Sequence, residues 1–283
     1  MELLPPIPRW EEIQEAVGAV ENIELLAETH KNTLYKLKTA GGTFVVKYSR
    51  RGWAEYEYHS MKRLREEGYA VPEPFNFFET EEEEGKSRYG TLKKVPGILV
   101  FEFIDGPSML DLMSEELVKK TADVIKKIHQ DPRHKRDQPF IKNYSEIEVE
   151  RMQYHFEKKE ATFADLKSEL EQLSGEYVQH EIEYTTIHGD FRPSNILVKN
   201  GELYLIDFEG TCEGGDPLKD VGTFYGETLI NHPKYAEIFR ESYGTEMTVP
   251  LKFHTIRRLL VLAAFEDIDC SFVKEKIEDV LRK

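Results

Sequence analysis

Two short polar segments near residue 200 constrain this chain more than any other feature. The first is HGDFRPSNIL, residues 188–197, and the second is LIDFEG, residues 205–210. They carry two acids, Asp190 and Asp207, and one amide, Asn195, among apolar neighbours. Buried polar groups cost free energy unless they have hydrogen-bond or metal partners. We therefore expect these three side chains to form part of a functional site rather than to serve packing.

The residues that link the two segments predict a β-hairpin. Ile196–Lys199 forms a strand, Asn200-Gly201 is a two-residue turn signal, and Leu203–Ile206 forms the return strand. Such a hairpin brings the carboxylate of Asp207 back beside Asn195. Two neighbouring oxygen ligands with another carboxylate close by suit Mg²⁺, which keeps water and phosphate as its other ligands. Phosphoryl transfer needs this arrangement, because its catalysis consists mainly of positioning groups and neutralising charge.

The paired segments resemble the catalytic loop and the metal-binding acid of the protein-kinase-like fold, in the form found in aminoglycoside phosphotransferases and choline kinases. Protein kinases carry His-Arg-Asp with an Asn five residues after the Asp, and then Asp-Phe-Gly. This chain has His188-Gly189-Asp190 and then Asp207-Phe208-Glu209, and both departures point to the small-molecule branch of the superfamily. The resemblance implies an α+β, two-lobed fold with a small antiparallel-sheet N-lobe and a larger, mainly helical C-lobe.

This resemblance also implies a division of the chain. Residues 1–104 would form a nucleotide-clamping lobe that ends in a hinge, and residues 105–283 would form the catalytic and acceptor-binding lobe. A chain of 283 residues is long enough for two lobes that each have a core.

The composition limits the partners and the compartment. The net charge of −15 argues against a nucleic-acid binder, which needs a basic face. Two cysteines predict free thiols in a reducing compartment rather than a disulfide framework. The N-terminus lacks the pattern of a signal peptide, and the longest apolar run, residues 259–265, is too short to cross a bilayer. We expect a cytoplasmic protein with no nucleic-acid or membrane partner.

The first fifty residues predict a short helix at Trp10–Ala19 and then three strands, at Ile23–Ala27, Thr33–Leu37 and Thr43–Tyr48. Lys47 lies in the third strand, in a stretch that resembles the V-A-I-K pattern of kinases. The resemblance implies that Lys47 draws charge from the α- and β-phosphates of the nucleotide.

The following helix, predicted at Ala54–Glu67, supplies a partner for this lysine. Glu57 recurs with apolar residues at spacings of four and three, so it lies on the face that turns inward. A carboxylate on a buried face needs a cation, and Lys47 is the obvious one. Glu55 is the competing acid, but it is offset by two residues and faces elsewhere. The resemblance likewise implies that Glu57 holds Lys47.

The loop between the first two strands, residues 28–32, contains no glycine. Protein kinases use a glycine-rich turn here so that backbone N–H groups approach the phosphates. In this chain Asn32 and Thr33 are candidates to supply polar contacts instead. An ordinary polar hairpin loop is the alternative.

A second nucleotide contact is expected at the apolar strand Ile98–Phe103. The stretch LVFEFIDG, residues 99–106, resembles the hinge that seats adenine, which implies that Glu102 and Ile104 offer backbone groups to the base. The acidic run Glu79–Glu84 before it predicts a solvated hairpin tip.

The residues beyond the hinge predict a mainly helical lobe. Ser108–Asp111 has a capping-box pattern, Glu115–Gln130 is a core helix, and Tyr235–Arg282 is helical. Ser145–Glu183 predicts two helices with 11 acidic against 4 basic residues. It either resembles the insertion that shapes the acceptor site in aminoglycoside and choline kinases or is a solvated charged helix pair. Three carboxylates near the end of the chain are candidates to bind a cationic group: Glu266, Asp267 and Asp269.

The resemblance assigns roles to the residues of the two opening segments. Asp190 would orient the acceptor hydroxyl and take its proton, while Asp207 and Asn195 would hold Mg²⁺ on the phosphates of ATP. Asp220, in the stretch Gly215–Val221 that resembles the DPxxDL segment of the family, would brace the catalytic loop.

Three supporting residues keep alternatives open. His188 is a structural tie of the loop or a catalytic group. Arg192 meets the γ-phosphate or a loop carboxylate. Glu209 touches a metal through water or binds a basic neighbour.

The short path from Asp207 to Asp220, 13 residues, favours a small-molecule acceptor. A protein kinase needs a longer activation segment that ends in Ala-Pro-Glu. We expect an ATP- and Mg²⁺-dependent phosphotransferase that acts on a hydroxyl of an aminoglycoside, amino-alcohol or sugar type molecule. The alternatives are a non-catalytic nucleotide-binding scaffold and an atypical protein kinase.

Overall fold

The computed structural model of this chain describes residues 7–50, 53–80, 83–87, 90–94 and 96–283, with residues 83–87 and 90–94 described by their backbone alone. The chain forms two compact units. The first consists of Met1–Pro107 and Leu197–Glu209, and the second of Ser108–Ile196 and Gly210–Lys283. Each unit is therefore built from two separate stretches of sequence. The lobe boundary expected after residue 104 stays a prediction.

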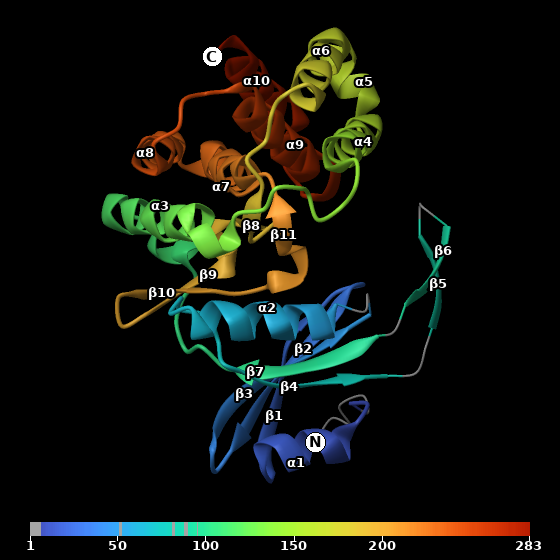
Figure 1. Ribbon diagram of the computed structural model, residues 1–283, viewed down its shortest axis with the longest axis vertical. Coiled ribbons are helices and arrows are strands. Elements are labelled where there is room, and N and C mark those ends of the chain that lie inside the picture. Colours follow the sequence, from blue (N-terminus) through green and yellow to red (C-terminus); the bar gives the residue numbers. More distant parts are fainter. Residues whose placement is uncertain (1–6, 51–52, 81–82, 88–89, 95) are drawn as a thin grey trace. The chain divides into compact units, whose positions relative to one another are not determined.

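A five-stranded antiparallel sheet is the centre of the first unit (Figure 1). Its order is β1-β2-β3-β7-β4, in which the strands are β1 Val20–Glu28, β2 Asn32–Thr39, β3 Gly42–Ser49, β7 Gly97–Glu102 and β4 Pro74–Glu79. This sheet confirms the predicted antiparallel N-lobe. The first three strands are longer than the sequence pattern indicated, because the hydrogen-bonded ladder continues through polar residues at their ends.

Strand alternation gives the sheet two different faces. Phe44 and Val46 of β3 pack into an apolar cluster with Ile13 of helix α1, Trp10–Val17. Because successive side chains of a strand point to opposite faces, Lys47 points away from this cluster. Helix α2, Ala54–Glu66, packs beside β4 and β7. The sequence thus places Lys47 on the face opposite the α1 cluster.

The packing of α2 on the sheet depends on a glycine. An added Cβ at Gly97, the first residue of β7, would lie 2.7 Å from the Cβ of Ala54 at the start of α2. No side chain fits at this distance, so the strand and the helix approach each other more closely than a larger residue allows.

The acidic run before β7 differs from the prediction. The chain forms a separate two-stranded hairpin from β5, Glu83–Ser87, and β6, Gly90–Lys94. Part of the predicted tip, Glu79–Glu84, therefore belongs to the strands β4 and β5, because the chain extends the ladder before it turns. Residues 81–82 of that run lie outside the described residues.

The predicted hairpin after the catalytic loop is present. Strands β9, Ile196–Lys199, and β10, Glu202–Leu205, pair across Asn200 and Gly201, whose φ angles of 53° and 76° fit a type I′ turn. Two backbone bonds tie it to the first unit. Val198 N donates to Pro107 O at 2.9 Å, and Leu205 N donates to Ala70 O at 3.1 Å.

The second unit is mainly helical, as predicted. Its α-helices are α3 Glu115–Gln130, α4 Tyr144–Glu157, α5 Glu160–Phe163, α6 Lys167–Val178, α7 Pro217–Asn231, α8 Pro233–Tyr243, α9 Val249–Phe265 and α10 Cys270–Arg282. Residues of all helices from α4 to α10 build one apolar core. A short antiparallel pair, β8 Thr185–Ile187 with β11 Cys212–Gly215, precedes and follows the polar segments.

Two local predictions for this unit were wrong. The segment Ser145–Glu183 contains three α-helices rather than two, because the chain makes a short extra turn, α5, before α6. Ser108 does not form a capping box. Its hydroxyl donates to the carboxylate of Asp111 at 2.9 Å, so it bonds a side chain instead of an amide, and the segment is a 3₁₀ turn.

Both cysteines, Cys212 and Cys270, are free thiols, as the sequence predicts. Among the described residues, no helix combines the length and the apolar character that crossing a lipid bilayer requires.

The close contact at Gly97 leads to a stability prediction. Gly97→Ala should lower the free energy of unfolding by about 1–3 kcal/mol, because the new methyl group overpacks against Ala54. Gly175→Ala is the matched control, since Gly175 lies in α6 with nothing within 4 Å of the added Cβ. That change should instead stabilise by about 0.5–1 kcal/mol. Urea unfolding measures both, and equal effects of the two changes would contradict this view of the packing.

Candidate active site

Lys47 is the centre of the polar site in the first unit. Its side chain is 4% exposed, and its Nζ lies 3.0 Å from Glu57 Oε2, 2.8 Å from Asp207 Oδ1 and 2.8 Å from Glu209 Oε1. The predicted ion pair with Glu57 is therefore present, and two more carboxylates share the same cation.

Glu57 links helix α2 to the segment after β10. Besides Lys47, its carboxylate accepts a hydrogen bond from the backbone N–H of Phe208 at 3.1 Å. Its side chain is buried, as are Met61 and Leu64 on the same face of α2. Glu55, the competing acid, is exposed and lies beside His59. The helical spacing therefore predicted correctly that Glu57, and not Glu55, is the partner of Lys47.

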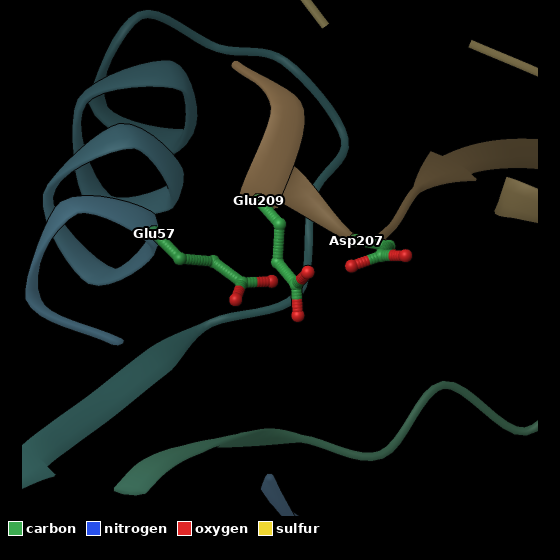
Figure 2. Close-up of side chains that lie close together, drawn as sticks. All are labelled: Glu57, Asp207 and Glu209. Carbon is green, nitrogen blue, oxygen red and sulfur yellow. The ribbon is translucent and has the colours of Figure 1, made fainter. Parts of the chain in front are cut away.

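Figure 2 shows the three carboxylates, from α2 and from the segment after β10, close together. One oxygen from each of Glu57, Asp207 and Glu209 lies within 4.8 Å of the others. Asp207 has a φ of 67°, a left-handed conformation that is uncommon outside glycine and typical of functional turns. Asn32 of β2 donates its amide N–H to Glu209. The sequence missed this last contact, because the two residues lie far apart in the chain.

The charges of this site are unbalanced, because one lysine serves three carboxylates. The pKa of Glu57 is raised, first by burial and then by the charges of Asp207 and Glu209, although Lys47 lowers it. Burial lowers the pKa of Lys47, but the three carboxylates outweigh it and hold the pKa well above its ordinary value. Lys47 therefore stays charged, and the group retains an excess of negative charge.

The catalytic loop lies in the second unit. Asn195 donates its amide N–H to the backbone oxygen of Asp190 at 2.9 Å and to Asp190 Oδ2 at 3.1 Å. Arg192 Nε lies 3.3 Å from the same Oδ2, and the side chain of Asp190 is 36% exposed. Arg192 thus meets a loop carboxylate, which is one of its two predicted alternatives. Because the amide nitrogen of Asn195 is used by Asp190, its amide oxygen is the atom that can bind a cation.

Asp220 of α7 holds the start of this loop. Its carboxylate is fully buried and accepts the backbone N–H groups of His188 and Gly189, each at 2.7 Å. The ring of His129 lies 3.1 Å from Asp220 Oδ2 and 2.9 Å from the hydroxyl of Tyr243. His129 was not among the predicted residues. Its place on the buried face of α3 was the only signal in the sequence.

The backbone conformation explains why the middle residue of His-Gly-Asp is a glycine. Gly189 has a φ of 82°, and an added Cβ would lie 1.8 Å from the backbone oxygen of Gly210. The loop therefore passes too close to the segment after Phe208 for any side chain at position 189. His188 is buried, and its backbone oxygen accepts a hydrogen bond from Thr211 at 3.4 Å, which fits a structural tie.

Other predicted residues have partners within the protein. Thr33 is buried and its hydroxyl accepts a hydrogen bond from Arg50 at 3.0 Å. The backbone N–H of Glu102 donates to Glu73 O at 2.8 Å, which leaves its carbonyl as the group to offer a base. Ile104 is buried.

Of the three acids near the C-terminus, two also have partners. Asp269 caps α10 by accepting the N–H of Ser271, and Glu266 lies 3.7 Å from Arg258. A role for these acids in binding a cation is therefore weaker than the sequence suggested.

The predicted residues thus gather in two groups. Lys47, Glu57, Asn32, Asp207 and Glu209 come together in the first unit. The second unit brings together the loop and its supports: His188, Asp190, Arg192, Asn195 and Asp220. The expected approach of Asp207 to Asn195 joins residues of different units and stays a prediction.

An antiparallel sheet with a buried Lys–Glu pair, together with a helical unit that carries the His-Gly-Asp loop, defines a phosphotransferase of the protein-kinase-like fold. The chain belongs to the phosphotransferase enzyme family, which it matches over residues 22–253. It is therefore an enzyme of the small-molecule kinase class, and the scaffold alternative is set aside.

Solved structures share this fold at low sequence identity. A spectinomycin phosphotransferase in complex with ADP and spectinomycin is 16% identical, with 96% of this chain and 95% of that chain covered and a TM-score of 0.62. An aminoglycoside phosphotransferase is 14% identical, with 96% and 97% covered and a TM-score of 0.66. An amicoumacin kinase in complex with AMP-PNP and Ca²⁺ is 14% identical, with 97% and 92% covered and a TM-score of 0.58. A search of curated protein sequences finds no significant match.

The geometry of Asp220 leads to a prediction about stability and pH. Asp220→Asn should lower the free energy of unfolding by about 3 kcal/mol at neutral pH, because an amide cannot accept both loop N–H groups. Burial raises the pKa of Asp220, but its bonds to His129 and to the loop outweigh burial and lower it. The carboxylate therefore stabilises the fold above its unfolded pKa of about 3.9, and this contribution is lost as the pH falls below that value.

Urea unfolding at several pH values measures both effects. As the pH falls from about 4 through the lowered pKa of Asp220, the variant should lose less stability than the wild type. Asp279→Asn is the control, since the side chain of Asp279 is 43% exposed and pairs with Arg282, so its loss should cost no more than about 1 kcal/mol. If Asp220→Asn behaved like this control, Asp220 would not hold the loop.

Proposed function

We propose that the protein transfers the γ-phosphoryl group of ATP to a hydroxyl group of a small molecule. The single observation that carries this proposal is the buried Lys47–Glu57 pair beside Asp207, in a chain that belongs to the phosphotransferase enzyme family. The solved relatives that hold ADP or AMP-PNP support a nucleotide as the donor. Sugars, amino-alcohols and aminoglycosides are the acceptor types that the resemblance implies.

The first unit binds the nucleotide in this proposal. Lys47, held in place by Glu57, draws charge from the α- and β-phosphates. Asn32 lies close enough to the acidic group to bond a phosphate oxygen once Glu209 turns away. The carbonyl of Glu102 and the backbone N–H of Ile104 receive adenine. The hydroxyl of Thr33 accepts a hydrogen bond from Arg50 and keeps its own proton to donate to a phosphate oxygen.

The donor set of the first unit fits a hard divalent cation. Three carboxylates share one lysine, and carboxylate oxygens are the ligands that Mg²⁺ prefers. We assign the metal to Asp207 and to the amide oxygen of Asn195, with Glu209 as a neighbouring carboxylate that contacts Lys47. Bound Mg²⁺ would neutralise negative charge on the β- and γ-phosphates.

Asp190 is the residue that receives the acceptor in this proposal. Its carboxylate is partly exposed and is held by Asn195 and Arg192, so a hydroxyl group can approach it in a fixed orientation. It orients the hydroxyl and accepts its proton as the phosphoryl group is transferred. The residues that support it are His188 and Asp220, through the backbone of the loop.

An ADP-release assay across amino-alcohols, aminoglycosides, sugars, sugar phosphates and hydroxy acids tests the proposal. We expect Asp190→Asn to lower kcat by about 10²–10⁴-fold, the range of general acid–base catalysis, while ADP binds with unchanged affinity. Chelation of divalent metal should abolish turnover, and added Mg²⁺ should restore it. Asp137→Asn is the matched control, because Asp137 is an exposed aspartate of the same unit.

Two outcomes would contradict the proposal. One is a full rate in Asp190→Asn. The other is the absence of turnover of any acceptor together with tight binding of ATP.

A further inference from the structure

A group of basic side chains surrounds one buried carboxylate in the second unit. The carboxylate is Glu148 of α4, whose side chain is 1% exposed. Its Oε1 lies 3.2 Å from Nζ of Lys219 on α7 and contacts Arg151 of α4, and its Oε2 lies 3.4 Å from Nε of Arg257 on α9. We call these four side chains the basic cluster. It contains three cations and a single anion.

The positive charge of the cluster exceeds what Glu148 neutralises. Burial lowers the pKa of Lys219, and the charges of Arg257 and Arg151 lower it further, although Glu148 raises it. Beside the cluster, burial and then the charge of Arg257 lower the pKa of His155 to about 4. Like charges disfavour a protonated base in this way. The surroundings therefore have a positive potential that suits an anion.

The cluster also has an unpaired neighbour and access to solvent. Arg257 Nε is held by Glu148, but His155 Nδ1 beside the cluster is buried and makes no hydrogen bond among the described residues. Buried polar atoms are normally paired, so such an atom points to a ligand. The side chain of Arg151 is 42% exposed, which opens one side of the cluster to solvent.

The basic cluster is connected to the catalytic loop. Lys219 directly precedes Asp220, whose carboxylate holds the backbone of His188 and Gly189. Cys212 of β11 is the strand partner of Ile187 of β8, just before the catalytic loop. Burial raises the pKa of its thiol to about 11. The charge of Lys219 lowers this pKa, and the charge of Glu148 raises it. The cluster is therefore linked to the backbone before the catalytic loop through α7 and through Cys212.

A second feature of this unit has the opposite charge. A pocket of about 410 Å³ is lined by α4, α5 and α6. Its charged residues are three acids and one base: Glu157, Glu160, Glu171 and Lys167. An acidic pocket of this kind suits an amine. Its lining includes no residue of α7, the helix that carries Asp220, so the basic cluster has the closer connection to the catalytic loop.

We infer that the acceptor carries an anionic group, a carboxylate or a phosphate, which Arg151, Arg257 and Lys219 bind while its hydroxyl group lies at Asp190. This inference rests on the proposed function and narrows its acceptor to hydroxylated molecules with a negative charge. Guanidinium groups suit both anions, because their N–H donors form charge-assisted pairs with planar or tetrahedral oxyanions. The net charge of −15 repels an anion in general, so a local basic site is what its capture requires.

The test is ADP release with matched acceptors that differ in charge: a sugar, its amino derivative, its carboxylate and its phosphate. Turnover should favour the anionic acceptors, and the comparison of the carboxylate with the phosphate identifies the anion. Arg257→Gln and Arg151→Gln should each raise KM for the anionic acceptor by about 10- to 100-fold, the loss of a charge-assisted hydrogen bond, with little change in KM for ATP. Arg133→Gln is the control, because Arg133 is 54% exposed and pairs with Asp131.

A thermal-unfolding measurement keeps the inference testable without turnover. With the nucleotide site saturated by ADP, inorganic phosphate should stabilise the wild type more than chloride at equal ionic strength. Arg257→Gln should lose this increment, whereas Arg133→Gln should keep it. If phosphate gave no such increment, the basic cluster would be a structural ion-pair network.

The two proposals fail differently. Suppose that the enzyme prefers a cationic acceptor, that Asp190→Asn abolishes turnover and that Arg257→Gln leaves the rate unchanged. This result would overturn the anionic acceptor and leave the phosphotransferase proposal intact. Suppose instead that only Arg257→Gln loses the thermal stabilisation by phosphate and that Asp190→Asn keeps the full rate. This result would support the anion site and overturn Asp190 as the group that receives the hydroxyl.

Discussion

The ion pair between Lys47 and Glu57 is the interaction on which the site of the first unit depends. A lysine that is almost fully buried must have its charge balanced, because the desolvation of an ammonium group costs several kcal/mol. Glu57 meets this need and accepts the N–H of Phe208 as well. One carboxylate therefore joins the central strand, the helix beside it and the segment that carries Asp207. The position of Asp207 is thus determined by the same contact that holds Lys47.

In the second unit another buried carboxylate holds a segment of the site in place. Asp220 is buried, accepts two backbone N–H groups of the catalytic loop and contacts His129. In both units a buried acid at a helix holds an irregular segment in a conformation that the segment would not keep alone. The left-handed backbone of Gly189 and of Asp207 lies next to these two acids. Glycine adopts this conformation freely, but for Asp207 it is strained and persists only where the surroundings hold it.

The sequence predicted those parts of the structure that local spacing determines. Helical spacing placed Glu57 rather than Glu55 toward Lys47, and the Asn200-Gly201 signal located the hairpin before Asp207. Contacts between distant residues left no such signal. The bond from Asn32 to Glu209 and the ring of His129 beside Asp220 depend on how whole elements pack. The basic cluster was missed for the same reason, since its members come from three helices and Glu148 lies in a segment whose composition is acidic.

A double-mutant cycle on Lys47 and Glu57 tests the central claim most directly. The measurement is kcat/KM for ATP in the wild type, Lys47→Met, Glu57→Gln and the double variant. If Glu57 acts by holding Lys47, the double variant loses little more than Lys47→Met, and the coupling energy is at least about 2 kcal/mol. Additive losses, with a coupling energy near zero, would mean that the two residues act independently and would contradict the account.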